Sequence, residues 1–358
     1  MTLRRPLLVP AVLAAVLIPG LLAGCSSSGG NAAMATLTGV STARVGHLEK
    51  TAVTVYAAPS TDSTGLYVAQ YMGYFKAQGL TVNIQPAASA ESAINLMAAG
   101  KVDMVGASYV SLVEAQENWV DEAQAHPGYI SPSYQRMAAN IDVFAEGSEL
   151  TQDFQGLFVP SGSSIKSISQ LKGQTIAIDA TGGVGYVTIA SALLAAGIQP
   201  TSVKWAVMPF SKMTNALLSG EITAAYLPEP YNSFDEERYA FTALSDLDVG
   251  LTADFPMEGY AVTKSWAQQN PNTLTAFFRA LEQGQEIADT NRQVAEQATE
   301  EFIPGITPSI AAILTMETYP VGPVDASRIQ RVADDIQLVR LSATSGIYNI
   351  QQILGDNG

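Results

Sequence analysis

The fold of this chain is decided by residues 65–107, GLYVAQYMGYFKAQGLTVNIQPAASAESAINLMAAGKVDMVGA. Apolar residues first recur at the spacing of one helix face, at Val68, Tyr71, Met72 and Phe75. Apolar and polar residues then alternate over 80–84, as they do in a half-buried strand. A second helix is predicted after Ser89, which is placed to cap its start, and short strands precede and follow the stretch. The order strand, helix, strand, helix, strand predicts half of an open parallel α/β sheet.

A second copy of this pattern lies further along the chain. Its strands are predicted at 175–178, 203–207 and 222–226. The segment LMAAGKVDM at 96–104 matches LLSGEITA at 217–224 in spacing and polarity. Asp103 of the first copy corresponds to Thr223 of the second, a difference that we expect to be structural, with the threonine capping a strand end. The repeat predicts two α/β domains.

The composition narrows the function. The chain has 358 residues, of which 47% are hydrophobic and 14% charged, so two well-packed domains are possible. A formal net charge of −15 argues against nucleic acid as a partner, because nucleic acid is bound by basic patches. The only cysteine is Cys25 and the only histidines are His47 and His126. We therefore expect no disulfide, no metal site, no cofactor and no catalytic residues.

The N-terminus predicts export. Residues 1–24 contain two arginines followed by a long apolar run, the pattern of a secretory signal peptide. LAGC at 22–25 resembles a bacterial lipobox, which implies cleavage before Cys25 and lipid attachment to it; an ordinary signal with a chance cysteine is the alternative. Residues 25–50 then read as the lipidated cysteine and a flexible tether. We expect a protein anchored by its lipid to the extracytoplasmic side of the cell membrane.

Five motifs carry a resemblance to a known family: GYFKAQGL (73–80), AAGKVDMVGA (98–107), SIKSISQLKGQTIAI (164–178), the glycines of TGGVG (181–185) and LPEPY (227–231). They are similar to solute-binding proteins of ABC importers in the nitrate, sulfonate, taurine and thiamine-pyrimidine group. The resemblance implies a type II periplasmic-binding-protein fold, an α/β class with two α/β domains and a ligand cleft between them.

The same resemblance places the domains. We expect domain I at 51–156 and 260–358 and domain II at 157–259. The chain is expected to cross between them near 158–160 and 260–262, where hinge closure would act. The apolar stripes after residue 270 are assigned to covering domain I.

The implied function is capture of a solute outside the cell and delivery to an importer permease, by a monomer that is not an enzyme. The ligand would be a small organic anion or zwitterion of the sulfonate, taurine or nitrate type. An aminopyrimidine thiamine precursor or a related heterocycle is the alternative. Two rivals are an enzyme of the same fold, which would need histidine and cysteine in its site, and a surface lipoprotein that binds another protein.

Ligands of open sheets bind at the carboxyl ends of the strands, so the loops there supply the predicted contacts. These are Ser63, Thr64, Gly65, Ser89, Ser108, Tyr109, Thr181, Gly182, Gly183, Glu229 and Tyr231. Helix starts near Thr64, Ser89 and Gly183 could hold an anion through free N–H groups without an arginine. The glycines of TGGVG serve either ligand contact or a tight turn.

Acidic and aromatic residues in these loops leave the ligand class open. Glu229 could accept a hydrogen bond from an amine, or it could bind backbone N–H groups at a hinge; Asp62 is a weaker case of the same kind. Tyr109, Tyr186 and Tyr231 could stack on a ligand or pack at a domain rim. Lys212 is the only base in the predicted loops.

Replacing Cys25 with alanine should release the protein from the membrane while residues from 51 onward still fold. The reason is that stable anchoring needs two acyl signals, which a diacylated N-terminal cysteine supplies. Membrane and soluble fractions are compared for Cys25→Ala and for the neighbouring control Ser28→Ala, which should stay membrane-bound. Retention of Cys25→Ala in the membrane fraction contradicts the lipid anchor.

Overall fold

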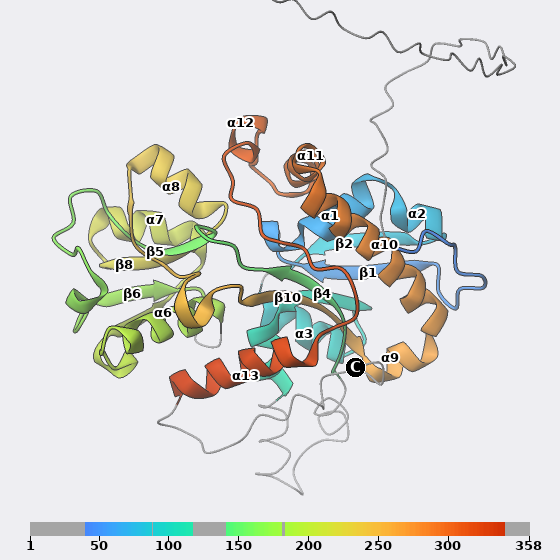
Figure 1. Cartoon of the computed structure of the whole chain (residues 1–358), viewed down its shortest axis with the longest axis horizontal. Helices are drawn as coiled ribbons and strands as arrows, with labels where there is room; N and C mark the ends of the chain where they lie inside the picture. Colours follow the sequence, from blue (N-terminus) through green and yellow to red (C-terminus); the bar gives the residue numbers. More distant parts are fainter. Residues whose placement is uncertain (1–39, 88, 117–140, 181–182, 341–358) are drawn as a thin grey trace, which may run out of the picture. The chain divides into compact units, whose positions relative to one another are not determined.

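The computed structural model describes residues 40–87, 89–116, 141–180 and 183–340 (Figure 1). The predicted signal peptide, Cys25 and the first part of the tether lie outside these residues, as do His126, Thr181 and Gly182. Within the described residues the chain forms a mixed α/β structure with two five-stranded sheets. This confirms the predicted fold class.

The first sheet has the strand order β2-β1-β3-β10-β4. Its strands are β1 (Ala52–Ala57), β2 (Thr81–Pro86), β3 (Met104–Ser108), β4 (Ile141–Glu149) and β10 (Pro256–Thr263). Strand β1 pairs in parallel with β2 and β3, and β10 runs antiparallel between β3 and β4. The carboxyl ends of β1 and β3 therefore lie at the same edge as the start of β10.

The second sheet has the order β7-β6-β8-β5-β9. Its strands are β5 (Gln155–Val159), β6 (Thr175–Ile178), β7 (Lys204–Val207), β8 (Ala224–Pro228) and β9 (Thr242–Asp246). Three parallel strands again lie beside an antiparallel one, here β5. In each sheet the antiparallel strand directly follows a crossover between the sheets. Strand β5 follows the first crossover and precedes β6, β7 and β8, and β10 follows the second crossover. The predicted repeat is thus present in the topology.

The chain crosses between the sheets twice, at 150–154 and at 247–255. The two segments run together, because Leu150 N donates to Phe255 O at 2.9 Å and Leu247 N donates to Gln155 O at 3.3 Å. The predicted crossover positions, 158–160 and 260–262, were wrong by a few residues. Phe158 and Val159 are buried in β5 and residues 260–262 are buried in β10, so these positions belong to strands, and the crossovers precede them. The domain boundaries themselves remain a prediction.

Helices cover both faces of the first sheet. Helices α1 (Thr64–Tyr71), α2 (Tyr74–Gln78) and α10 (Pro271–Thr290) form one apolar cluster with it, and α3 (Ala90–Ala98) belongs to another. The helical pattern before Leu80 is split into α1 and α2 because Gly73 has a φ of +75°, which a helix interior does not accept. The other helices are α6 (Val184–Ala195), α7 (Phe210–Ser219), α8 (Tyr231–Tyr239), α9 (Lys264–Gln269), α11 (Arg292–Phe302), α12 (Pro308–Ala311) and α13 (Ala326–Arg340).

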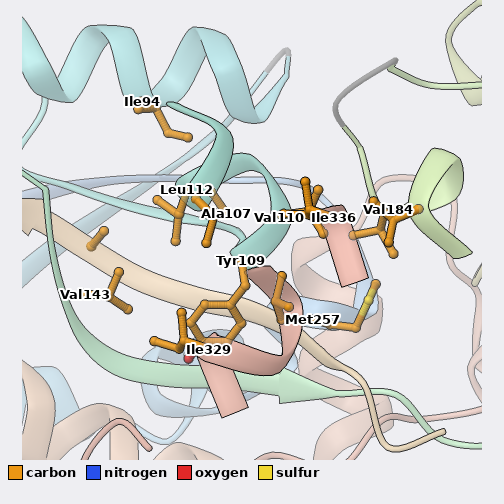
Figure 2. Packing of buried hydrophobic residues seen from close by; sticks show 14 of the residues in the cluster. Ile94, Ala107, Tyr109, Val110, Leu112, Val143, Val184, Met257, Ile329 and Ile336 are labelled. Atoms are coloured by element: carbon orange, nitrogen blue, oxygen red, sulfur yellow. The ribbon is translucent and has the colours of Figure 1, made fainter. Parts of the chain in front are cut away.

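Helix α13 contacts both halves of the chain. Its residues Ile329 and Ile336 are buried in one cluster with Tyr109 and Val110, which follow β3, and with Val184 of α6. Figure 2 shows Ile336 beside Val110 and Val184. The apolar stripe of α13 was predicted to cover the first domain. It packs there on Tyr109 and Val110, and in addition it packs on α6.

Two glycines let α1 and α10 pack closely. A Cβ added to Gly65 would lie 2.6 Å from Cγ of Gln285, and one added to Gly284 would lie 2.6 Å from Cβ of Ala69 and closer still to the Gly65 carbonyl oxygen. Both distances are shorter than real Cβ contacts. The requirement for glycine at these positions therefore comes from helix packing.

Gly284→Ala should destabilise the folded state by about 1–3 kcal/mol, because the new methyl group meets backbone that cannot move without displacing α1. The free energy of unfolding is measured by urea titration. Gly46→Ala is the matched control, since a Cβ at that exposed residue meets nothing within 4 Å. Equal stability of the two variants contradicts the packing argument.

Candidate functional site

Four acidic side chains gather at the carboxyl edges of the two sheets: Asp62, Asp179, Glu258 and Glu317, here called the carboxyl cluster. Asp62 lies in the short 3-10 helix η1 (Thr61–Ser63) that follows β1, and Asp179 follows β6 directly. Glu258 lies near the start of β10, opposite Ser108, the last residue of β3.

Glu317 reaches the cluster from the irregular segment between α12 and α13. The next residue, Thr318, forms an isolated bridge with Glu149, the last residue of β4. Glu149 N donates to Thr318 O at 3.0 Å and Thr318 N donates to Glu149 O at 3.2 Å. This bridge fixes a segment distant in sequence at the carboxyl edge of the first sheet.

Asp62 is the member that connects the others. Its charge raises the pKa of Glu258, Glu317 and Asp179, so it is close to carboxyls from both sheets. The carboxyls of Asp62 and Glu317 lie within hydrogen-bond reach of each other, with Glu317 as the protonated partner. Asp62 is half-buried as a residue, but its carboxyl is enclosed.

Hydroxyl groups donate to some of these carboxyls. Ser60 Oγ donates to Asp62 Oδ2, and Ser63 Oγ donates to Glu258 Oε1 at 2.8 Å. Neither oxygen of Glu317, which is 4% exposed, makes a hydrogen bond of ordinary geometry, and the same holds for Oδ1 of Asp62. The Ser148 hydroxyl also lies within reach of Glu317. The hydroxyl donors supplied by the chain are still fewer than the carboxyl oxygens gathered here.

Buried tyrosines surround the cluster. Tyr67 OH donates to Ala58 O at 2.8 Å and Tyr319 OH donates to Thr61 O at 3.0 Å, so both hydroxyls are directed to backbone of the η1 region. Tyr226 of β8 donates its hydroxyl to Gln155 Oε1. Burial raises the pKa of Tyr226, and the charges of Asp179, Asp62, Asp248 and Glu317 add to the effect. Its ring is thus near carboxyls of both sheets.

Burial raises the pKa of every carboxyl in the cluster. The pKa of Glu258 is raised to about 8, first by burial and then by Asp62. Burial raises the pKa of Asp179 to about 6, against hydrogen bonds from the backbone N–H groups of Asp179 and Ala180. The pKa values of Asp62 and Glu317 are also raised, with burial as the largest cause. Near neutral pH the cluster therefore holds protons.

No base compensates these carboxyls within the described residues. The ion pairs there join Lys50 to Asp103, Arg292 to Glu296, and Arg328 to Glu146 and Glu149. None includes a member of the carboxyl cluster. Lys212, the base of the predicted loops, is exposed on α7.

Several predicted contacts of the first half lie beside the cluster. Ser63 bonds Glu258, and Thr64, the first residue of α1, places its Oγ1 3.3 Å from Oγ1 of Thr299. Gly65 lies under α10, as described above. Ser108 caps the following helical turn, because its Oγ accepts from Ser111 N at 3.1 Å.

Two other predicted contacts lie elsewhere. Ser89 caps α3 as predicted, with Oγ accepting from Ser92 N at 3.1 Å, and it lines a surface hollow with other residues of α3. No member of the carboxyl cluster lines that hollow. Tyr109 is 1% exposed and packs in the core, so the structure gives it the packing role that the sequence left as an alternative to ligand stacking.

In the second half, Gly183 is the N-cap residue of α6, and a Cβ on it would lie 3.2 Å from Oδ2 of Asp179. Gly185 has a different reason to be glycine, since a Cβ there would overlap the ring of Tyr226. Tyr231 is half-buried, with its ring 5.1 Å from that of Phe210. Thr181 and Gly182 lie outside the described residues.

Glu229 is occupied by partners within the chain. Its Oε1 accepts from Ser233 Oγ at 2.8 Å and from Thr315 N at 2.9 Å, and its N–H donates to Phe154 O at 3.1 Å. Burial raises its pKa to about 7. These contacts fit the hinge alternative, because they tie the loop after β8 to the first crossover and to the segment that carries Glu317. Ligand contact by Glu229 remains a prediction.

Sequence reasoning missed three members of the cluster. Glu258 had a readable signal, as the one charged residue in the otherwise uncharged strand PMEGYAVT. Asp179 also had one, since it directly follows a predicted strand of the second copy. Glu317 had none, because it lies in an irregular segment that only the bridge to Glu149 brings to the site.

Comparison with known proteins identifies the family. The NMT1-like family profile matches residues 46–301, which is most of the chain. The chain belongs to the NMT1-like family. No curated protein sequence matches it. The family match and the structural neighbours confirm the resemblance seen in the sequence.

The structural neighbours of this NMT1-like chain are periplasmic binding proteins. The alkanesulfonate-binding protein SsuA from Xanthomonas axonopodis pv. citri, bound to MOPS, has a TM-score of 0.66 and 14% identity, over 84% of this chain and 96% of that one. The nitrate-binding protein NrtA from Synechocystis PCC 6803 has a TM-score of 0.69 and 15% identity, over 86% and 87%. SsuA from Escherichia coli has a TM-score of 0.64 and 16% identity, over 86% and 92%. At these identities the likeness establishes the fold.

Among the described residues, no helix has both the length and the apolar character needed to span a membrane.

Stability should fall as pH rises from about 5 to about 8. Because burial raises the pKa of Glu258 from 4.5 to about 8, the folded state binds this proton more tightly than the unfolded state. The stabilisation is present below the unfolded pKa and is lost as pH rises through the folded pKa, on the order of 3–5 kcal/mol for Glu258 alone. Urea unfolding of ligand-stripped protein at several pH values measures this.

Glu258→Gln is the control for that measurement. It should remove part of the pH dependence and leave a remainder of the same sign, because burial also raises the pKa of Asp248 to about 8 and that of Glu229 to about 7. A stability that is flat or rising between pH 5 and 8 contradicts the assignment of these carboxyls.

Proposed function

We propose that this protein is an extracytoplasmic solute receptor of an ABC importer and that it binds its solute at the carboxyl cluster. The observation that carries the proposal is the position of Asp62 and Asp179, which follow the first parallel strand of each sheet, with the charge of Asp62 raising the pKa of Asp179. In open α/β sheets, ligands bind outside the carboxyl ends of the strands. A site that uses both sheets is suited to a receptor that closes on its solute.

The two crossovers supply the proposed hinge. Residues 150–154 and 247–255 are hydrogen-bonded to each other, so they can bend together. Gln155 and Asp248 lie at their ends next to Tyr226, since Gln155 N donates to Asp248 Oδ2 at 3.3 Å and Gln155 Oε1 accepts from Tyr226. Bending at the crossovers would therefore change the spacing between Tyr226 and the first sheet.

The anchor and the partner complete the proposal. The signal peptide and Cys25 predict that a lipid holds the protein on the extracytoplasmic side of the membrane, where a permease can receive the solute. Family membership supports this role, and the structural neighbours include sulfonate- and nitrate-binding proteins. An enzyme of the same fold has less support, because His47, the one histidine among the described residues, is exposed, and the described residues include no cysteine.

A screen by thermal shift tests the receptor role. Purified, refolded protein is heated with sulfonates, taurine, nitrate, aminopyrimidines, amino acids and amines, and a solute of the right class should raise the melting temperature. A solute present at 100 times its Kd stabilises the folded state by about 2.7 kcal/mol. Native mass spectrometry of freshly purified protein searches in parallel for a co-purifying small molecule.

The proposal fails if no solute class shifts the melting temperature and no small molecule co-purifies. That result would favour the surface lipoprotein that binds another protein. Turnover of any bound solute by the purified protein would favour the enzyme.

A further inference from the structure

We infer that the solute is a small organic cation carrying one or two protonated amine groups, held by Asp62, Asp179, Glu258 and Glu317. The inference rests on the proposed function and names its substrate class. It departs from the sulfonate, taurine or nitrate type that the sequence resemblance implied.

The first argument is the balance of donors and acceptors. Glu317 is 4% exposed. The Ser148 hydroxyl and the Asp62 carboxyl lie within reach of its carboxyl, yet neither Glu317 oxygen makes a hydrogen bond of ordinary geometry. Oγ1 of Thr61, a residue with no exposed surface, also lacks a hydrogen bond. Buried acceptors of this kind need donors, and an ammonium group offers up to three N–H donors and no acceptor.

The second argument is charge. An anion would approach four carboxyls, and the ion pairs of the described residues leave no Lys or Arg among them. An organic cation has the opposite effect: it favours the ionised carboxylates that burial disfavours. The enclosed position strengthens this preference, since charges interact more strongly away from water.

The third argument concerns the helix starts that were predicted to hold an anion. The Asp179 carboxyl already accepts from the backbone N–H groups of Asp179 and Ala180, beside Gly183 at the start of α6. At the start of α1, the hydroxyl of Ser63 already donates to Glu258. Carboxyls of the chain therefore lie beside both helix starts, which disfavours an external anion there.

The arrangement suits an organic cation better than a metal ion. No group of three or more metal-ligating side chains with suitable geometry is present in the described part of the chain. The tyrosines Tyr67, Tyr226 and Tyr319 supply large apolar surfaces beside the carboxyls. Carboxylates bordered by aromatic rings fit the charge and the carbon skeleton of an alkylamine.

The experiment is calorimetric titration of the mature chain with three small probes that differ in charge: 1,4-diaminobutane, taurine and ethanesulfonate. The diamine should bind most tightly. Glu317→Gln and Glu258→Gln should each weaken it at least tenfold. Asp235→Asn is the matched control and should leave its affinity unchanged, because Asp235 is a buried carboxyl of α8 bonded to Thr214 Oγ1 at 2.7 Å.

A second measurement needs no variant. Binding of the diamine should release protons from the carboxyl cluster, so its affinity should rise between pH 6 and 8. The titratable and charged groups that face the site are its four carboxyls, the tyrosines Tyr67, Tyr109, Tyr226, Tyr260 and Tyr319, and beside these tyrosines Asp248 and Arg292. Titrations in two buffers of different ionisation enthalpy count the released protons.

The outcomes separate this inference from the receptor role. Tighter binding of taurine or ethanesulfonate than of the diamine overturns the cationic class and leaves the receptor standing. Binding of Ca²⁺, Mg²⁺ or Zn²⁺ in preference to the diamine also overturns it. Diamine affinity that is unchanged in both glutamine variants, or uptake of protons on binding, removes the carboxyl cluster as the site. Absence of any bound small molecule in the broader screen counts against the receptor itself.

Discussion

A carboxyl group taken out of water needs a proton, a hydrogen-bond donor or a positive charge, and this constraint governs the site of this protein. Elsewhere in the chain, basic side chains satisfy this requirement. Asp103, directly before β3, accepts from Lys50 Nζ at 2.5 Å and from Trp266 Nε1 at 2.9 Å. Glu149 at the end of β4 is paired with Arg328 at 2.5 Å. In the carboxyl cluster the chain offers hydroxyl groups and protons instead. A bound ligand that supplies donors or positive charge would therefore have its largest stabilising effect at the carboxyl cluster.

The topology explains why these carboxyls meet. Each sheet has four strands that run in one direction and one antiparallel strand, β10 or β5, which directly follows a crossover. Because β10 runs antiparallel to β3, its beginning lies at the edge where β1 and β3 end, and Glu258 is placed beside η1. The same exchange puts Gln155 of β5 next to the end of β8, from which Tyr226 reaches the cluster. The two crossovers thus connect the sheets, and the strands that follow them place Glu258 and Gln155 at the site.

The packing of helices on the first sheet positions part of the site. Close approach of α1 to α10 requires Gly65 and Gly284, and it fixes the start of α1 one residue after Ser63. The Ser63 hydroxyl is then held against Glu258. Helix α13 adds a contact between the region after β3 and α6, which limits how the two sheets can move without repacking (Figure 2).

Much of the fold could be predicted from the sequence, because it depends on local periodicity. Alternating and helical patterns gave the parallel strands, the duplication and the Ser89 cap, and the motif resemblance gave the family. Of the site, the sequence indicated the η1 region with Ser63 and Thr64, and the first turn of α6 with Gly183, since both follow strands of a parallel sheet. It also allowed the hinge alternative for Glu229, whose contacts with Ser233 and Thr315 fit it.

The chemistry of the site was decided by the tertiary structure. Asp62, Asp179, Glu258 and Glu317 are separated by 59 residues or more along the chain, and each alone reads as an ordinary acidic residue. Only β10 between β3 and β4, and the bridge from Thr318 to Glu149, bring Glu258 and Glu317 to the edge of the first sheet where Asp62 lies. Burial and mutual charge, which raise their pKa values, exist only after that assembly. The sequence by itself determined the elements and their order, because these follow from local patterns, whereas the charge of the site depends on distances that only the folded chain sets.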